Sequence, residues 1–128
     1  MICRRPRDRD YNYRVHVGVR KFGNVVIVDL EGDLVAGDGD EVLRDVCTEL
    51  VAEGWRNILV NLARVGRLDS SGVGELVASW KLAKEFGAGI TLLRPGDRVR
   101  STLHLSQILP LVQVYEDEAE ALRRLSSE

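Results

Sequence analysis

Residue types that often identify a function are scarce in this sequence of 128 residues. Its two cysteines and two histidines all stand far apart along the chain, so the spacing of metal ligands is missing. Cys3 lies in a polar segment and Cys47 on the apolar side of an expected helix, which argues against a disulfide framework and indicates a reducing cytoplasm. No apolar run approaches the roughly 18 residues of a membrane span, so we expect no membrane insertion.

A large charge of one sign is also lacking. The formal net charge of −2 provides no bulk attraction to nucleic acid or to an anionic membrane, and we expect neither as a direct partner. Hydrophobic residues make up 45% of the chain, which is enough for one core. We therefore expect a single domain over residues 13–126 that follows a flexible polar tail over 1–12. The arginines of this tail are not followed by an apolar stretch, so we do not interpret the tail as a secretory signal.

The spacing of apolar residues predicts an α/β fold. Alternating or continuous β-branched runs indicate strands, and apolar residues three and four apart indicate helices. The expected strands span 14–20, 25–30, 57–62, 90–93 and 111–115. Helices are expected from about 38 to 54, from 70 to 87, from 95–97 onward and from 117 to 125. The order ββαβαβαβα predicts a mixed sheet of about five strands with about four helices.

Local signals mark the expected ends of these elements. Asp38 and Asp117 each precede a glutamate by three residues, which is the spacing of a capping box at a helix start. Gly87 and Gly89 are expected to stop the long second helix. Residues 21–24 have the composition of a hairpin turn between the first two strands.

The most informative segment is 69–74, which reads Asp-Ser-Ser-Gly-Val-Gly. It follows an expected strand and opens a helix, so two hydroxyls stand where unpaired N–H groups and the helix dipole favour an anion or an attached phosphate. Capping alone would explain Asp69 or Ser70, but each glycine costs up to about 1 kcal/mol in a helix relative to alanine. A close approach by a partner backbone, or tight packing of the helix on the sheet, would explain Gly72 and Gly74.

This motif, in this order of elements, resembles the STAS domain and above all the bacterial anti-sigma factor antagonists. The strand that runs into Glu-Gly-Asp-Leu at 31–34 and the closing stretch 114–122 support the resemblance, which covers residues 13–125. It implies a switch in which the unmodified protein binds an anti-sigma factor that is also a serine kinase, and so frees a sigma factor. The kinase then phosphorylates the motif, and a serine phosphatase removes the mark. By position the acceptor is Ser70, with Ser71 as the alternative.

The resemblance also implies a set of partner-binding residues. They are Asp33, Asp69, Ser70, Ser71, Gly72, Val73 and Gly74. The first loop departs from the family pattern, because Val35 stands where a second acid is expected and Ala-Gly-Asp-Gly at 36–39 replaces the residues that follow. Since that loop often contributes to the partner surface, a second function stays open: a constitutive interaction module of the same fold, such as a transporter accessory subunit or a signalling scaffold.

No constellation of residues predicts catalysis. Ser70 has no base in a triad context, because His16 falls in the first expected strand and His104 near the third expected helix. The arginines within 94–100 are interpreted as a solvated basic face. We therefore expect a protein that is not an enzyme and that uses no metal and no cofactor.

Overall fold

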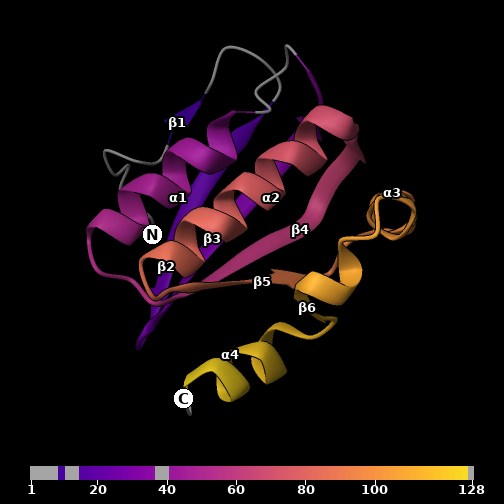
Figure 1. Ribbon diagram of the computed structural model, residues 1–128. Coiled ribbons are helices and arrows are strands. Elements are labelled where there is room, and N and C mark those ends of the chain that lie inside the picture. Colours follow the sequence, from indigo (N-terminus) through magenta and orange to yellow (C-terminus); the bar gives the residue numbers. More distant parts are fainter. Residues whose placement is uncertain (1–8, 11–14, 37–40, 127–128) are drawn as a thin grey trace.

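A mixed β-sheet forms the centre of the computed structural model, which describes residues 9–10, 15–36 and 41–126 (Figure 1). Its six strands lie side by side in chain order: β1 Arg9–Asp10, β2 His16–Phe22, β3 Val25–Leu34, β4 Asn57–Leu68, β5 Gly89–Leu93 and β6 Gln113–Tyr115. The helices of the described residues are α1 Val42–Ala52, α2 Ser70–Glu85, α3 Asp97–Leu105, α4 Glu118–Ser126 and the 3₁₀-helix η1 Leu109–Leu111.

Strand direction divides the sheet into two parts. β1, β2 and β3 pair antiparallel, and the chain turns from β2 into β3 at Gly23, whose φ of 60° suits a tight hairpin. From β3 to β6 each pair is parallel, so every connection there contains a helix. Because parallel strands end at the same edge of a sheet, the ends of β3 and β4 lie together where α2 begins.

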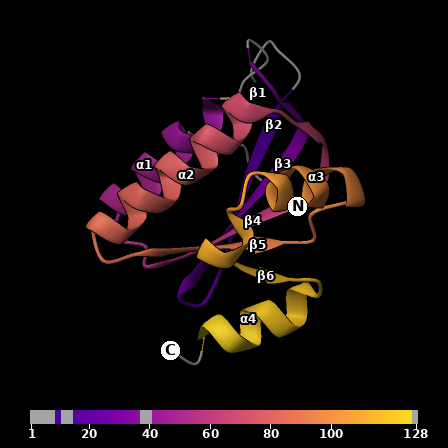
Figure 2. The same cartoon turned by 45° about the vertical axis from the view of Figure 1, so that its right-hand side comes forward.

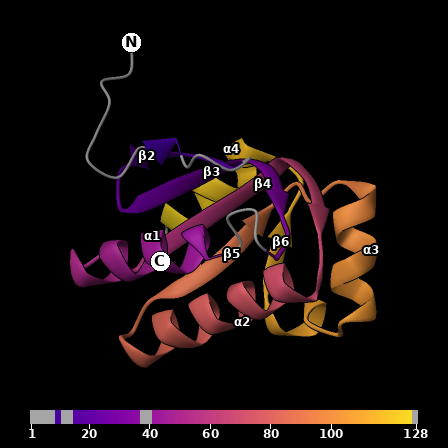
Figure 3. The same cartoon turned by 90° about the horizontal axis from the view of Figure 1, so that it is seen from above.

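Helices cover both faces of the sheet (Figures 2 and 3). α1 and α2 lie side by side on one face, where their buried residues Leu43 and Leu76 join Val17, Val28 and Ile58 of the strands in the larger core. α4 lies on the other face over a smaller cluster. That cluster consists of Val25, Ile27, Leu59, Leu93, Ala121, Leu122 and Leu125. The remainder of this second face carries polar side chains.

The expected mixed α/β sheet is confirmed, because all five expected strands and all four expected helices are present in the expected order. β1 is an addition that lies within the predicted tail and pairs with β2. β3 and β4 are longer than expected, since they run together to Leu34 and Leu68 instead of ending at residues 30 and 62. Two register shifts along β3 break the regular alternation on which the prediction depended.

The expected ends of α1 and α2 agree with the structure only in part. The cap of α1 is Glu41, whose side chain makes no capping hydrogen bond, whereas Asp38 lies outside the described residues. α2 ends before Gly87, which adopts a φ of 79° that favours glycine. Gly89, however, is the first residue of β5 and takes no part in stopping the helix.

The C-terminal part agrees better with expectation. β6 starts two residues later than predicted, because Pro110 lies in η1 and this short helix occupies the beginning of the expected strand. Asp117 caps α4 as expected, since its carboxylate accepts a hydrogen bond from the backbone N–H of Glu120 at 2.9 Å.

Candidate functional site

Asp69 fixes the start of α2. Its extended backbone makes it the N-cap, and its carboxylate accepts a hydrogen bond from the backbone N–H of Gly72 at 3.0 Å. The second carboxylate oxygen accepts from the backbone N–H of Ala36, also at 3.0 Å. Asp69 therefore holds the helix start and the beginning of the loop after β3 together. Sequence analysis missed the Ala36 contact, because a backbone N–H leaves no signature in the residue type.

Hydrogen bonding lowers the pKa of Asp69. The bond from the Ala36 N–H has the largest effect, and those from the N–H groups of Gly72 and Ser71 act in the same direction, while partial burial opposes them. The charged carboxylate is thus the stable form at neutral pH. Ala36, where the sequence departs from the family pattern, is consequently tied to the motif through a charged group.

The two serines of the motif differ in exposure. Ser70, the first residue of α2, is exposed, whereas Ser71 is half-buried. Residues four apart share a side of a helix, so Ser71 lies on the same side as Glu75, which forms an ion pair with Arg44 of α1 at 3.1 Å. Ser70 shares its side with Gly74, which is exposed. Ser71 is therefore on the side toward α1, and Ser70 is on the side toward solvent.

The two glycines of the motif meet different requirements. A Cβ atom on Gly72 would lie 2.3 Å from the carbonyl oxygen of Leu34 and 2.5 Å from Cδ1 of Leu68, so glycine is needed for α2 to approach the strand ends this closely. A Cβ atom on Gly74 would meet no heavy atom within 4 Å. Packing of the helix on the sheet thus explains Gly72 and leaves Gly74 unexplained by the fold.

The remaining expected site residues are partly or fully buried. The structure buries Gly72 and Val73 against the sheet. In the folded chain these two residues position the helix, and their expected contact with a partner remains a prediction. Asp33 is half-buried on β3, where its carboxylate lies 3.5 Å from the guanidinium of Arg67 on β4. The exposed part of the motif consists of Ser70 and Gly74.

Polar side chains also lie between α1 and α2, further along α2 from the motif. The ion pair of Arg44 and Glu75 is the first of these contacts, and one turn further Ser79 is fully buried beside Cys47. Burial raises the pKa of the Cys47 thiol to about 12, and the Ser79 hydroxyl acts in the opposite direction. Because a thiol reacts as its thiolate, Cys47 is a packing group and not a nucleophile.

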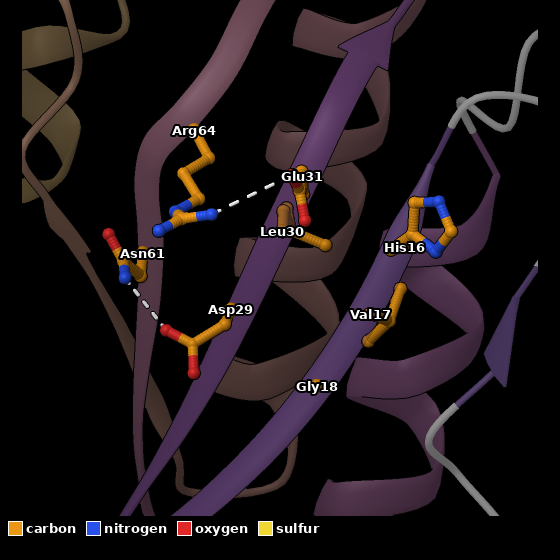
Figure 4. A pocket seen from close by; sticks show the side chains of 8 residues that line it. All are labelled: His16, Val17, Gly18, Asp29, Leu30, Glu31, Asn61 and Arg64. Carbon is orange, nitrogen blue, oxygen red and sulfur yellow. Dashed lines mark hydrogen bonds and ion pairs between the residues drawn. The ribbon is translucent and has the colours of Figure 1, made fainter.

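The uncovered end of the second sheet face carries a hollow of about 370 Å³ (Figure 4). Asp29 accepts two hydrogen bonds from Arg20, at 2.5 and 2.8 Å, and a third from Asn61 at 2.7 Å. Glu31 and Arg64 form an ion pair of 3.7 Å beside them. Asp29 and Glu31 in the lining of the hollow are thus each paired with an arginine, and the network around Asp29 joins three neighbouring strands.

Other kinds of site find no support in the part of the chain that the structure describes. No three His, Cys, Asp or Glu side chains gather there in a way that could hold a metal ion. Among the helices of those residues, none has both the length and the apolar character needed to cross a membrane. His16 lies on β2 and His104 on α3, so neither shares an element with Ser70.

Comparison with known proteins agrees with the geometry. The model of the STAS domain matches residues 16–121. This chain belongs to the STAS domain family. The anti-sigma F factor antagonist of Paenibacillus polymyxa is 26% identical to it over 101 residues, which cover 79% of this chain and 86% of the relative.

Solved structures of anti-sigma factor antagonists share the fold. One from Mycobacterium paratuberculosis has a TM-score of 0.76 at 20% identity, and the match covers 86% of this chain and 92% of that one. SpoIIAA in its unphosphorylated form has a TM-score of 0.72 at 23% identity, with 88% and 97% covered. The phosphorylated form of SpoIIAA from Bacillus has a TM-score of 0.65 at 22% identity, with 85% and 98% covered. The relatives of this STAS protein therefore include anti-sigma factor antagonists.

Proposed function

We propose that this STAS protein is an anti-sigma factor antagonist that phosphorylation of Ser70 switches off. In its unphosphorylated state it binds an anti-sigma factor that is also a serine kinase, and a sigma factor is released. The kinase phosphorylates Ser70, the complex weakens, and a serine phosphatase restores the binding form. The named function of the Paenibacillus relative and the two phosphorylation states of SpoIIAA support this proposal.

The observation that carries the proposal is the position of Ser70. Asp69 holds the helix start with hydrogen bonds to Gly72 and Ala36, and Ser70 stands exposed directly after it. A kinase can therefore reach the Ser70 side chain without unfolding the helix. Ser71 is the weaker candidate, because it is half-buried on the side that faces α1.

Gly74 supports a partner surface on the same side of α2. It is exposed, the fold does not need it, and it lies one turn after Ser70. With glycine at this position, the backbone of another protein can approach the helix more closely than it could with any other residue there. We therefore propose that the anti-sigma factor contacts Ser70 and Gly74, with Asp33 and Ala36 at the border of the contact.

Electrostatics accounts for the effect of the modification. A phosphate adds about −1.5 to −2 charges, and a helix N-terminus tolerates an anion, so we expect the fold to persist. Asp69 stands next to it and adds charge of the same sign. The new charge and bulk instead disfavour contact with the partner that packs over the helix start. A loss of about 3–4 kcal/mol of binding free energy would weaken binding more than a hundredfold.

The proposed action is binding and not catalysis. The chain recognises proteins, requires no cofactor or metal, contacts no nucleic acid directly, and acts in the cytoplasm together with its kinase and phosphatase. The network around Asp29 and the buried Cys47 serve the fold in this proposal, since the charged groups of the network are paired with one another and the thiol is buried.

Phosphosite mapping tests the proposal. The protein would be isolated from its native cells during growth and under stress, as wild type, Ser70→Ala and Ser71→Ala, and analysed by mass spectrometry. We expect a phosphate on Ser70 that changes with condition, disappears in Ser70→Ala and persists in the matched control Ser71→Ala. Partners that co-purify would be identified in the same samples, with less partner bound when Ser70 is phosphorylated.

The departure of the loop from the family pattern favours one competing function. A constitutive interaction module would bind its partner through the same face without modification, and Val35 in place of an acid is what points to it. The module would be the better explanation if the protein carried no phosphate in any condition and the wild type and Ser70→Ala still co-purified with the same partner.

A further inference from the structure

The side of α4 that borders the tip of the β2–β3 hairpin forms an apolar groove with it. The groove has a volume of about 540 Å³ and is lined by Phe22, Glu118, Ala119, Leu122, Arg123 and Ser126. It lies at the opposite end of the sheet from Ser70, because the hairpin tip precedes β3 whereas α2 begins where β3 and β4 end (Figure 1). Nothing in the proposed switch uses this surface.

Phe22 is a large apolar side chain on the rim of this groove. Its exposed fraction is 56%, although it pairs with Val25 at the last position before the hairpin turn. A hairpin turn through Gly23 needs no aromatic residue before it. The surface therefore presents a protruding apolar side chain and an apolar hollow next to each other, which are the two halves of a self-complementary contact.

The charges of α4 have the matching symmetry. Its first turn is acidic, with Glu118 and Glu120, and its last turn is basic, with Arg123 and Arg124. Glu118 lines the groove toward one end of the helix and Arg123 toward the other. When two such helices lie antiparallel, the acidic half of each meets the basic half of the other. Glu118 already receives two hydrogen bonds from Arg20, at 2.8 and 3.0 Å, but a carboxylate has room for a further donor.

We propose that this groove is a self-association surface whose occupant is a second copy of the chain. Two copies related by a two-fold axis place their α4 helices antiparallel, with Phe22 of each in the groove of the other. Both exposed Ser70 positions stay uncovered in such a dimer, since they lie at the far ends. Each copy contributes only six groove residues, whereas a standard interface takes about 20–30 residues a side, so the dimer is weak and depends on concentration.

Sedimentation velocity of the full chain tests this inference. Wild type would be measured from about 5 µM to about 1 mM, and we expect reversible dimer formation within that range. Ala119→Arg fills the groove from an exposed helical position, and Phe22→Ser removes the protruding ring. Each should weaken the dimer by about tenfold or more, while circular dichroism shows an unchanged fold.

Matched controls separate the groove from general effects on the surface. Phe86→Ser removes a phenylalanine that is 65% exposed after α2, outside the groove, and Ala52→Arg places the same charge on an exposed alanine of α1. Both should leave the dimer constant unchanged. For the charges, Arg123→Glu should weaken the dimer, whereas Arg98→Glu on α3 should not.

Two results would overturn the inference. If the chain stays monomeric up to about 1 mM, self-association through the groove is excluded. A groove that binds a helix of another protein would leave the chain monomeric in this way. A dimer that forms equally well with Ala119→Arg, or that is weakened as much by Phe86→Ser as by Phe22→Ser, uses another surface. Neither result bears on phosphorylation of Ser70, so the switch and the dimer are tested separately.

Discussion

Replacing Gly72 and Gly74 by alanine should change the stability of the protein in opposite directions. Both residues lie in the same helix two positions apart, so composition and charge are matched. At Gly74 the new methyl group meets no heavy atom within 4 Å, and alanine gains up to about 1 kcal/mol of helix propensity over glycine. Gly74→Ala should therefore be more stable than wild type by up to that amount.

Gly72→Ala must accommodate a clash. Its Cβ atom would stand 2.3 Å from the carbonyl oxygen of Leu34 and 2.5 Å from Cδ1 of Leu68, about 1 Å closer than ordinary contacts. Leu34 and Leu68 are themselves buried at the paired ends of β3 and β4, so neither can move without disturbing the core. Overpacking of this kind costs about 1–3 kcal/mol, from which the propensity gain is subtracted. Because the nearest neighbour is a backbone oxygen, we take the upper part of that range, about 2–3 kcal/mol, and expect a net loss of about 1–2 kcal/mol.

Urea titration and thermal unfolding of the three proteins measure this difference. For a chain of this length, a change of 1 kcal/mol shifts the Tm by about 3–6 °C, so the two variants should unfold several degrees apart on either side of wild type. A Gly72→Ala protein as stable as wild type would refute the close approach of α2 to the strands. A Gly74→Ala protein that is more stable yet binds the anti-sigma factor normally would remove the argument for a partner over Gly74.

Three other substitutions test separate features. Asp69→Asn removes a carboxylate whose pKa is lowered by the fold. The free energy of unfolding of wild type should exceed that of the variant in full at pH 7, and the difference should disappear as the pH falls below about 4 and through the lowered pKa. A difference in urea midpoint that stays constant from pH 7 to pH 3 would contradict this. Gly18→Ala should stabilise by about 0.4–1 kcal/mol in thermal unfolding, because the nearest neighbour of its Cβ would be 4.0 Å away; destabilisation would show that the strand requires glycine there. In a Cys3→Ser background, Cys47 should react with a thiol reagent only after unfolding, and rapid labelling of the native protein would disprove its burial.

The interior of the fold was predictable because each element carries its own pattern. The continuous β-branched run of β3 and the apolar stripe of α2 follow directly from residue types. The ends of β3 and β4 were not predictable, since they depend on how two strands 23 residues apart, from Leu34 to Asn57, adjust their register. A pairing between distant segments leaves no periodic signal in either of them.

The candidate site shows the same division. The sequence predicts a capped helix start with hydroxyls, and the structure agrees on Asp69. It could not distinguish the two glycines, because the closest clash at Gly72 is with the backbone of Leu34, a residue far away in the chain. The ion pair of Arg44 and Glu75 was missed for the same reason, since these residues are 31 positions apart and neither belongs to a recognisable motif.

The occupancy of the helix start decides how a phosphate on Ser70 would act. An added anion at a helix N-terminus usually gains hydrogen bonds from unpaired N–H groups. Here the carboxylate of Asp69 already accepts from Gly72 and Ala36, and its lowered pKa keeps it charged. The phosphate would therefore meet a carboxylate and be directed away from the helix axis. Its charge would fall on the exposed side that Ser70 shares with Gly74, so under the proposed switch the modification would act on the partner surface and leave the domain beneath it intact.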